Sequence, residues 1–110
     1  MKWVEIENSG QVDTLLDDSM TTAQLIFKHS TRCSISSMAL RRAEDNLPIK
    51  NLAAHYLDLI AFREVSNYIA EITGVNHQSP QVILIRNKEV IYHASHGSMD
   101  WKEIENLCAN

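Results

Sequence analysis

The stretch QLIFKHSTRCSIS, residues 24–36, joins a run of apolar residues to a cysteine and then to a helical pattern. Its first five residues, Gln24–Lys28, form a compact apolar run of strand length, and Ser30-Thr31 is a turn signal. Apolar residues then recur at steps of three and four from Cys33 to about Asn46, before a proline ends the pattern. The stretch predicts a buried strand that leads through a short turn into a helix with Cys33 at its start.

Strand and helix patterns alternate on both sides of this stretch. Before it, we expect a short edge strand or packing segment at Met1–Ile6 and a helix at Gly10–Ser19 with Ser9 as its N-cap. After it, we expect a strand at Ala53–Ile60, whose alanines would also suit a helix, and a helix at Phe62–Thr73 with Gly74 as its C-cap. The chain then continues with a hairpin of Val82–Ile85 and Val90–Ala94, joined through Asn87-Lys88-Glu89, and a last helix at Asp100–Leu107. Two strand–helix units favour parallel pairing by right-handed crossovers, and the hairpin adds an antiparallel edge. The order predicts an α/β protein with a central four-stranded mixed sheet flanked by helices, which is the thioredoxin-like fold.

The length and composition are those of one globular domain. A chain of 110 residues is long enough for a single hydrophobic core and too short for two ordinary domains. Apolar residues make up 45% of it and charged residues 22%, which are typical proportions for folded proteins. We therefore expect a single thioredoxin-like domain over residues 1–110.

The charge pattern and the apolar runs narrow the possible partners. The net charge is -4, and Lys and Arg are scattered apart from Arg41-Arg42, whereas nucleic-acid binding needs a concentrated basic surface. Apolar runs such as Val82–Ile85 fall far below the roughly 20 residues that span a bilayer. Nothing after Met1 has the layout of a signal peptide. We expect a cytoplasmic protein with neither nucleic acid nor membrane as a partner, and in that reducing compartment its two cysteines are poor candidates for a structural disulfide.

Cys33 is the candidate nucleophile. Backbone amides and the positive end of the helix dipole favour the thiolate form of a cysteine at a helix start. Any cysteine could instead be a small buried apolar residue, but the strand-to-helix position and the polar neighbours favour catalysis. The third residue after it is Ser36 instead of a second cysteine. A serine hydroxyl could hydrogen-bond the thiolate but cannot displace a bound thiol, so an outside thiol must complete the reaction.

Two more residues belong to the candidate site. Pro80 stands just before the hairpin, where thioredoxin-fold proteins carry a cis-proline that faces the active cysteine, so we expect a cis bond between Ser79 and Pro80. His29 lies four residues before Cys33, and a protonated imidazole there would favour the thiolate. A strand-end histidine that hydrogen-bonds the backbone is an equal alternative for His29.

The motifs at residues 29–36 (HSTRCSIS), 79–82 (SPQV) and 93–96 (HASH) closely resemble the monothiol bacilliredoxin family, and the similarity covers nearly the whole chain. The family usually has proline directly after the cysteine, where this chain has Ser34. The resemblance implies removal of bacillithiol, a low-molecular-weight thiol, from mixed disulfides on client proteins. It implies bacillithiol as a co-substrate and no tightly bound cofactor.

The resemblance also implies which residues contact the substrate. The backbone of Ser79 would pair with an extended disulfide substrate while Pro80 shields Cys33. Thr31, Arg32 and Ser34 flank the cysteine, and Arg32 could attract the carboxylates of bacillithiol or simply be a solvated charge. In related proteins the region of Gly97 and Ser98 holds a small thiol. The alternative is that Ser98 caps the last helix and Asp100 lies favourably in its first turn.

Rival functions stay open at this point. An arsenate-reductase-like enzyme would depend on Arg32, since Arg41-Arg42 falls two turns into the helix and the phosphatase Cys-x5-Arg pattern has Ala39 instead of arginine. An iron–sulfur carrier would require Cys-Gly-Phe-Ser, and a non-enzymatic stress adaptor would need no reactive thiol.

The remaining histidines and the second cysteine offer little chemistry. No second ligand pair accompanies His77, His93 and His96 at a metal-site spacing, so we expect no metal. Cys108, at the expected frayed end of the last helix, is most simply incidental, with a resolving role left open.

Overall fold

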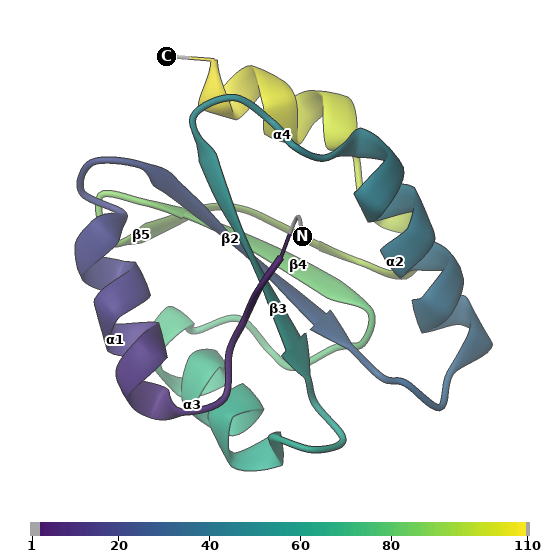
Figure 1. Ribbon diagram of the computed structural model, residues 1–110. Coiled ribbons are helices and arrows are strands. Elements are labelled where there is room, and N and C mark those ends of the chain that lie inside the picture. Colours follow the sequence, from purple (N-terminus) through teal and green to yellow (C-terminus); the bar gives the residue numbers. More distant parts are fainter. Residues whose placement is uncertain (1–2, 110) are drawn as a thin grey trace.

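A computed structural model describes residues 3–109, so the first two residues of the expected segment Met1–Ile6 lie outside the described residues. The elements in chain order are β1 (Val4–Glu5), α1 (Ser9–Asp18), β2 (Ala23–His29), α2 (Ser34–Asn46), β3 (Leu52–Asp58), α3 (Arg63–Thr73), β4 (Gln81–Arg86), β5 (Glu89–Ser95), the 3-10 turn η1 (His96–Ser98) and α4 (Trp101–Cys108). The strands form one mixed sheet in the order β1-β3-β2-β4-β5. This is the predicted α/β arrangement, and Figure 1 shows helices on both faces of the sheet.

The central strand β2 separates two apolar cores. All of its residues are buried, and successive side chains point to opposite faces. Leu25 and Phe27 pack on the face covered by α2 and α4, whereas Ile26 packs on the face covered by α1 and α3. A strand buried on both faces explains why Leu25–Phe27 is a continuous apolar run instead of an alternating pattern.

The sheet has five strands, which are the four expected central ones and one short strand at the edge. The additional strand, Val4–Glu5, pairs in parallel with His55 and Tyr56 of β3. It is two residues long, and both residues are exposed, which is why the sequence pattern left a strand and a packing segment as alternatives. The parallel pairing of β2 with β3 and the antiparallel hairpin are confirmed, whereas β4, which follows the second strand–helix unit, runs antiparallel to β2.

Two helix caps differ from the expectation. Asn8, not Ser9, caps α1, because its side-chain oxygen accepts a hydrogen bond from the backbone N–H of Gln11 at 2.9 Å. Asp100, not Ser98, caps α4 by accepting from the backbone N–H of Glu103 at 3.1 Å. In both cases the capping residue is an Asn or Asp that lies one or two positions from the predicted serine. Its side-chain oxygen accepts a hydrogen bond from an amide of the first helical turn.

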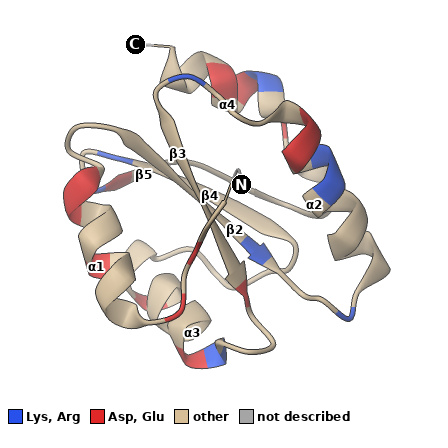
Figure 2. Ribbon diagram, viewed as in Figure 1, with Lys and Arg blue, Asp and Glu red and all other residues tan. Residues whose placement is uncertain are grey.

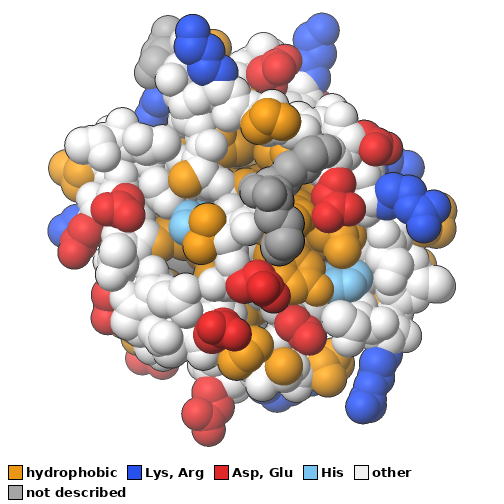
Figure 3. Space-filling view, viewed as in Figure 1, with side chains coloured by type: hydrophobic (Ala, Val, Ile, Leu, Met, Phe, Trp, Pro, Cys, Tyr) orange, Lys and Arg blue, Asp and Glu red, His pale blue; other side chains and the backbone are white. Residues whose placement is uncertain are grey.

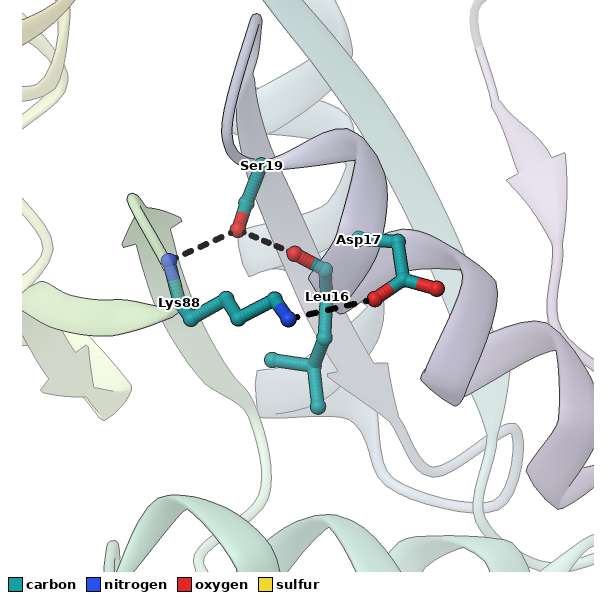
Figure 4. Close-up of polar contacts among 4 residues, drawn as sticks. All are labelled: Leu16, Asp17, Ser19 and Lys88. Carbon is teal, nitrogen blue, oxygen red and sulfur yellow. Dashed lines mark hydrogen bonds and ion pairs between the residues drawn. The ribbon is translucent and has the colours of Figure 1, made fainter.

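The turn of the β4–β5 hairpin is fastened to the end of α1. Asn87 and Lys88 both have positive φ angles, 54° and 64°, as a two-residue hairpin turn requires. The backbone N–H of Lys88 donates to Ser19 Oγ at 2.9 Å, and the Ser19 hydroxyl donates to the Leu16 carbonyl oxygen (Figure 4). The Lys88 ammonium also lies 3.4 Å from an Asp17 carboxylate oxygen. Ser19 thus joins elements far apart in sequence.

Charged residues are dispersed over helices, loops and strand ends. Figure 2 shows Lys and Arg interspersed with Asp and Glu, without a continuous basic face in this view. Apolar side chains are visible over the middle of the same face, where β1 and β3 cross it (Figure 3). Among residues 3–109, no helix is both long and apolar enough to cross a membrane.

Gly74 ends α3 in the left-handed region, at φ 72°, as the expected C-cap. We predict that Gly74→Ala lowers the free energy of unfolding by about 1 kcal/mol, because a Cβ disfavours this backbone region. A Cβ there would meet nothing within 4 Å, so backbone strain is the whole effect. Gly97→Ala, which also has open space but no such φ, is the control. Urea denaturation of both variants checks this, and equal losses would contradict it.

Candidate active site

The strand register brings the start of α2 and the Ser79-Pro80 loop to one edge of the sheet. Lys28 at the end of β2 pairs with Gln81 at the start of the antiparallel β4. The chain leaving β2 toward Cys33 and the chain entering β4 through Pro80 therefore lie at the same end. The Ser79–Pro80 bond is cis, as expected, and Leu47–Pro48 is cis as well.

The 3-10 turn η1 joins this edge. The backbone N–H of His96 donates to the carbonyl oxygen of Pro80 at 3.0 Å, and η1 also contacts α2. Gly97 and Ser98 are exposed in that turn. The structure therefore brings this candidate small-thiol region next to the proline loop.

Cys33 is the N-cap residue of α2 and is partly exposed. Its backbone N–H donates to the Ser30 carbonyl oxygen at 3.1 Å, and its own carbonyl oxygen accepts from the N–H of Ser37 at 3.0 Å, which starts the helix. Its side chain makes no capping hydrogen bond. The sulfur thus lies at a helix N-terminus and does not cap the helix. Its thiolate character stays a prediction.

Ser36 anchors the turn that carries Cys33. The residue is fully buried, and its hydroxyl oxygen accepts a hydrogen bond from the backbone N–H of Ser30 at 3.0 Å. The same hydroxyl lies 2.7 Å from Nδ1 of His29. Its partners are therefore the turn and the strand end, and the expected contact with the thiolate is not formed.

His29 is a neutral, buried link instead of a protonated neighbour of the thiolate. Its side chain is only 3% exposed, and burial lowers the pKa of His29 below its ordinary value. The charges of Asp58 and Glu44 and the hydrogen bond of Ser36 act in the opposite direction but do not overcome burial. Burial therefore disfavours the suggested protonated imidazole, and the alternative is met only in part, because the partner of the ring is the Ser36 hydroxyl and not the backbone.

The other predicted substrate contacts surround the cysteine. Thr31, Arg32 and Ser34 are exposed on the turn and first position of α2, whereas Ser79 is partly buried and Pro80 is buried. An exposed guanidinium and two exposed hydroxyls leave this side of Cys33 open to a polar ligand. Their roles in substrate binding stay predictions.

Cys108 belongs to the core. Its side chain is fully buried in the cluster between the sheet, α2 and α4, so the expected frayed helix end is wrong. Burial raises the pKa of Cys108 above its ordinary value, although the charge of Arg86 opposes this. A buried neutral thiol is a poor nucleophile, which disfavours a resolving role.

Three buried polar residues near the site escaped the sequence analysis. Lys28, Ser66 and Gln81 are at most 2% exposed. Lys28 ends an otherwise apolar run and Ser66 interrupts the apolar side of α3, which is the only signal that the sequence offered. Among the described residues, no group of three or more His, Cys, Asp or Glu side chains could hold a metal ion.

A cavity lies elsewhere in the fold. It has a volume of about 650 Å³ and is lined by residues of α1, β1 and β3 and the start of β2, including Asp18, Gln24 and His55. His55 Nε2 and Gln24 Oε1 already pair at 2.7 Å within it. None of the predicted site residues lines this cavity.

Comparison with known proteins agrees with this geometry. The family model for the monothiol bacilliredoxin BrxC matches residues 4–104. One similar solved structure has a thioredoxin fold and an inferred oxidoreductase function. It aligns with a TM-score of 0.84 at 25% identity and covers 96% of this chain and 92% of the other. Thioredoxins of Schistosoma mansoni (TM-score 0.75, 14% identity, 98% and 94% covered) and Trypanosoma brucei brucei (0.76, 15%, 98% and 92%) share the fold.

Removing the Ser36 hydroxyl should loosen the turn. We predict that Ser36→Ala lowers the free energy of unfolding by about 2 kcal/mol, because the Ser30 N–H and His29 Nδ1 lose their buried partner. Ser37→Ala, at the exposed next position, should change it by no more than about 0.5 kcal/mol. Chemical denaturation compares the two. Equal effects would show that the hydroxyl anchors nothing.

His29 should make the fold sensitive to mild acid. Its folded pKa lies below the ordinary 6.5, so the unfolded chain takes up the proton first and stability falls as the pH drops below that value. We predict a smaller loss of unfolding free energy between pH 7.5 and 5.5 for His29→Asn than for wild type. His93→Asn, at an exposed position, is the control and should behave like wild type. An unchanged loss in His29→Asn would contradict the assignment of a neutral imidazole.

Proposed function

This chain belongs to the monothiol bacilliredoxin family, and we propose that it removes bacillithiol from mixed disulfides on client proteins by attack of Cys33. The observation that carries the proposal is the partly exposed Cys33 at the start of α2 with buried Ser36, not a second cysteine, one turn later. One reactive thiol can accept a small thiol from a disulfide but cannot expel it alone.

The first step is a thiol–disulfide exchange. The Cys33 thiolate attacks the bacillithiol sulfur of the client mixed disulfide, a new disulfide forms between Cys33 and bacillithiol, and the client sulfur leaves as a thiolate that takes a proton from water. No net oxidation occurs, because one disulfide replaces another. The client regains its free cysteine.

The second step needs an external thiol. Its thiolate attacks the bacillithiol sulfur bound to Cys33, which releases the Cys33 thiolate and leaves a disulfide between bacillithiol and the attacking thiol. Bacillithiol itself is the simplest candidate, and the cytoplasm would supply it in reduced form. The hydroxyl of Ser36, committed to Ser30 and His29, contributes position and no electrons.

Polar groups around Cys33 suit a small anionic thiol. The exposed Arg32 guanidinium would pair with a carboxylate of bacillithiol, and Thr31 and Ser34 would offer hydroxyls beside it. Gly97 and Ser98 of η1, on the other side of Pro80, would receive the remainder of the thiol. The extended client chain would lie along the backbone of Ser79.

Cysteine variants test the one-thiol mechanism by the release of bacillithiol from a modified client. Cys33→Ser should lower turnover by at least about 1,000-fold, because the nucleophile is gone. Cys108→Ala should stay within about twofold of wild type while losing about 1 kcal/mol of stability to a small cavity. Loss of turnover in folded Cys108→Ala, or activity in Cys33→Ser, would contradict the proposal.

Ser36→Cys provides the complementary test. A cysteine one helical turn after Cys33 should close an intramolecular disulfide, so mass spectrometry should find mainly a species lighter by two hydrogens. Wild type under the same conditions should instead keep bacillithiol bound. A persistent bacillithiol adduct on Ser36→Cys would show that the turn cannot bring the two positions together.

A further inference from the structure

Lys28 is a lysine inside the protein. Its side chain is 0% exposed, and its Nζ donates to the backbone carbonyl oxygen of Ser66 in α3 at 3.2 Å. Among residues 3–109, no carboxylate lies within ion-pair distance of it. Lys88 shows the usual arrangement, with a 57% exposed side chain opposite Asp17 (Figure 4). Lys28 is the only Lys or Arg in β2, and Figure 2 shows the end of this strand in blue. Fully buried lysines without a carboxylate are rare.

This ammonium is costly for the folded state. Burial lowers the pKa of Lys28 to about 8, which reports the loss of solvation of the charged form. A single backbone carbonyl satisfies only one of its three donors. An apolar side chain of the same length would fit this position at a lower cost, so packing alone does not account for Lys28.

A polar residue of β4, Gln81, stands beside Lys28 and is bonded to the proline loop. Gln81 is its partner in the antiparallel register, so the two side chains stand next to each other on one face. The Gln81 amide nitrogen donates to the Asn76 carbonyl oxygen at 2.9 Å, which closes the loop onto β4. The Gln81 amide oxygen is buried with no hydrogen-bond partner, as is the Ser79 hydroxyl. Buried polar atoms of this kind mark a region built for more than packing.

The α3 side completes the arrangement. Ser66, whose carbonyl oxygen accepts from Lys28, has its hydroxyl 3.2 Å from His77 Nδ1. Burial is the largest cause of the lowered pKa of His77, and the charges of Lys28 and Arg63 lower it further. The loop therefore lies within the electrostatic influence of the Lys28 ammonium. Lys28 is therefore linked to Asn76 through β4 and to His77 through α3.

We propose that Lys28 is a positioning residue for substrate binding, which holds α3 and β4 together beneath the loop Val75–Pro80 so that the Ser79 backbone is ready to pair with the client mixed disulfide. The assignment rests on the proposed function of Cys33. Lys28 lies on the face of β2 opposite to His29, so it acts on the loop and not on the turn that carries the sulfur. Its loss should weaken substrate binding and leave the reactivity of Cys33 unchanged.

The test compares Lys28→Met with Lys88→Met, an exposed control. With a bacillithiolated client protein as substrate, Lys28→Met should raise KM by about tenfold and change kcat by no more than about twofold, because a loop held less firmly binds less well. Its Cys33 should react with iodoacetamide at the wild-type rate, and its Tm should equal or exceed that of wild type. Lys88→Met should keep the wild-type KM.

Each outcome decides the assignment. An unchanged KM in Lys28→Met, or a KM increase matched by slower alkylation of Cys33, would overturn it. If Lys28→Met does not fold, Lys28→Gln takes its place, and failure of both to fold would show a purely structural role. Wild type with no Cys33-dependent release of bacillithiol would instead refute the proposed function, independently of Lys28.

Discussion

The buried hydroxyl of Ser36 is the interaction on which the placement of the nucleophile depends. It accepts from the Ser30 N–H and pairs with His29, and so ties the last residue of β2 and the following turn to the first turn of α2. Ser30 in turn accepts from the N–H of Cys33. The serine that stands in place of a second cysteine is therefore also the residue that holds Cys33 at the helix start.

One end of the central strand is polar on both faces. His29 points toward the face of α2 and bonds to the helix that carries Cys33, whereas Lys28 points toward α3 and the loop before Pro80. Apart from Gln24, the rest of β2 is apolar and joins the two cores. The apolar part of the strand stabilises the fold by burial. The two basic side chains at its end orient the turn that carries Cys33 and the loop before Pro80. Burial removes water from both side chains and so lowers the pKa of Lys28 and of His29.

The sequence predicted the features that local chemistry determines. Strand and helix patterns gave the element order, the strand-to-helix position of Cys33, the C-cap at Gly74 and the place of Pro80. The two-residue β1 was ambiguous because it is held by pairing with His55 and Tyr56, more than fifty positions away. The caps at Asn8 and Asp100 were missed by one or two residues, since neighbouring polar side chains compete for the same amides. The charge state of His29 and the partners of Lys28 depend on burial and on the β2–β4 register, which no local pattern contains.

If Cys33 receives bacillithiol itself and not the client, intact and peptide mass spectrometry after a single turnover with a bacillithiolated client should show the transfer. We expect the protein to gain the mass of one bacillithiol, minus two hydrogens, on the peptide that contains Cys33, while the client loses the same mass. A covalent conjugate of protein and client as the main product, or bacillithiol on Cys108, would contradict it.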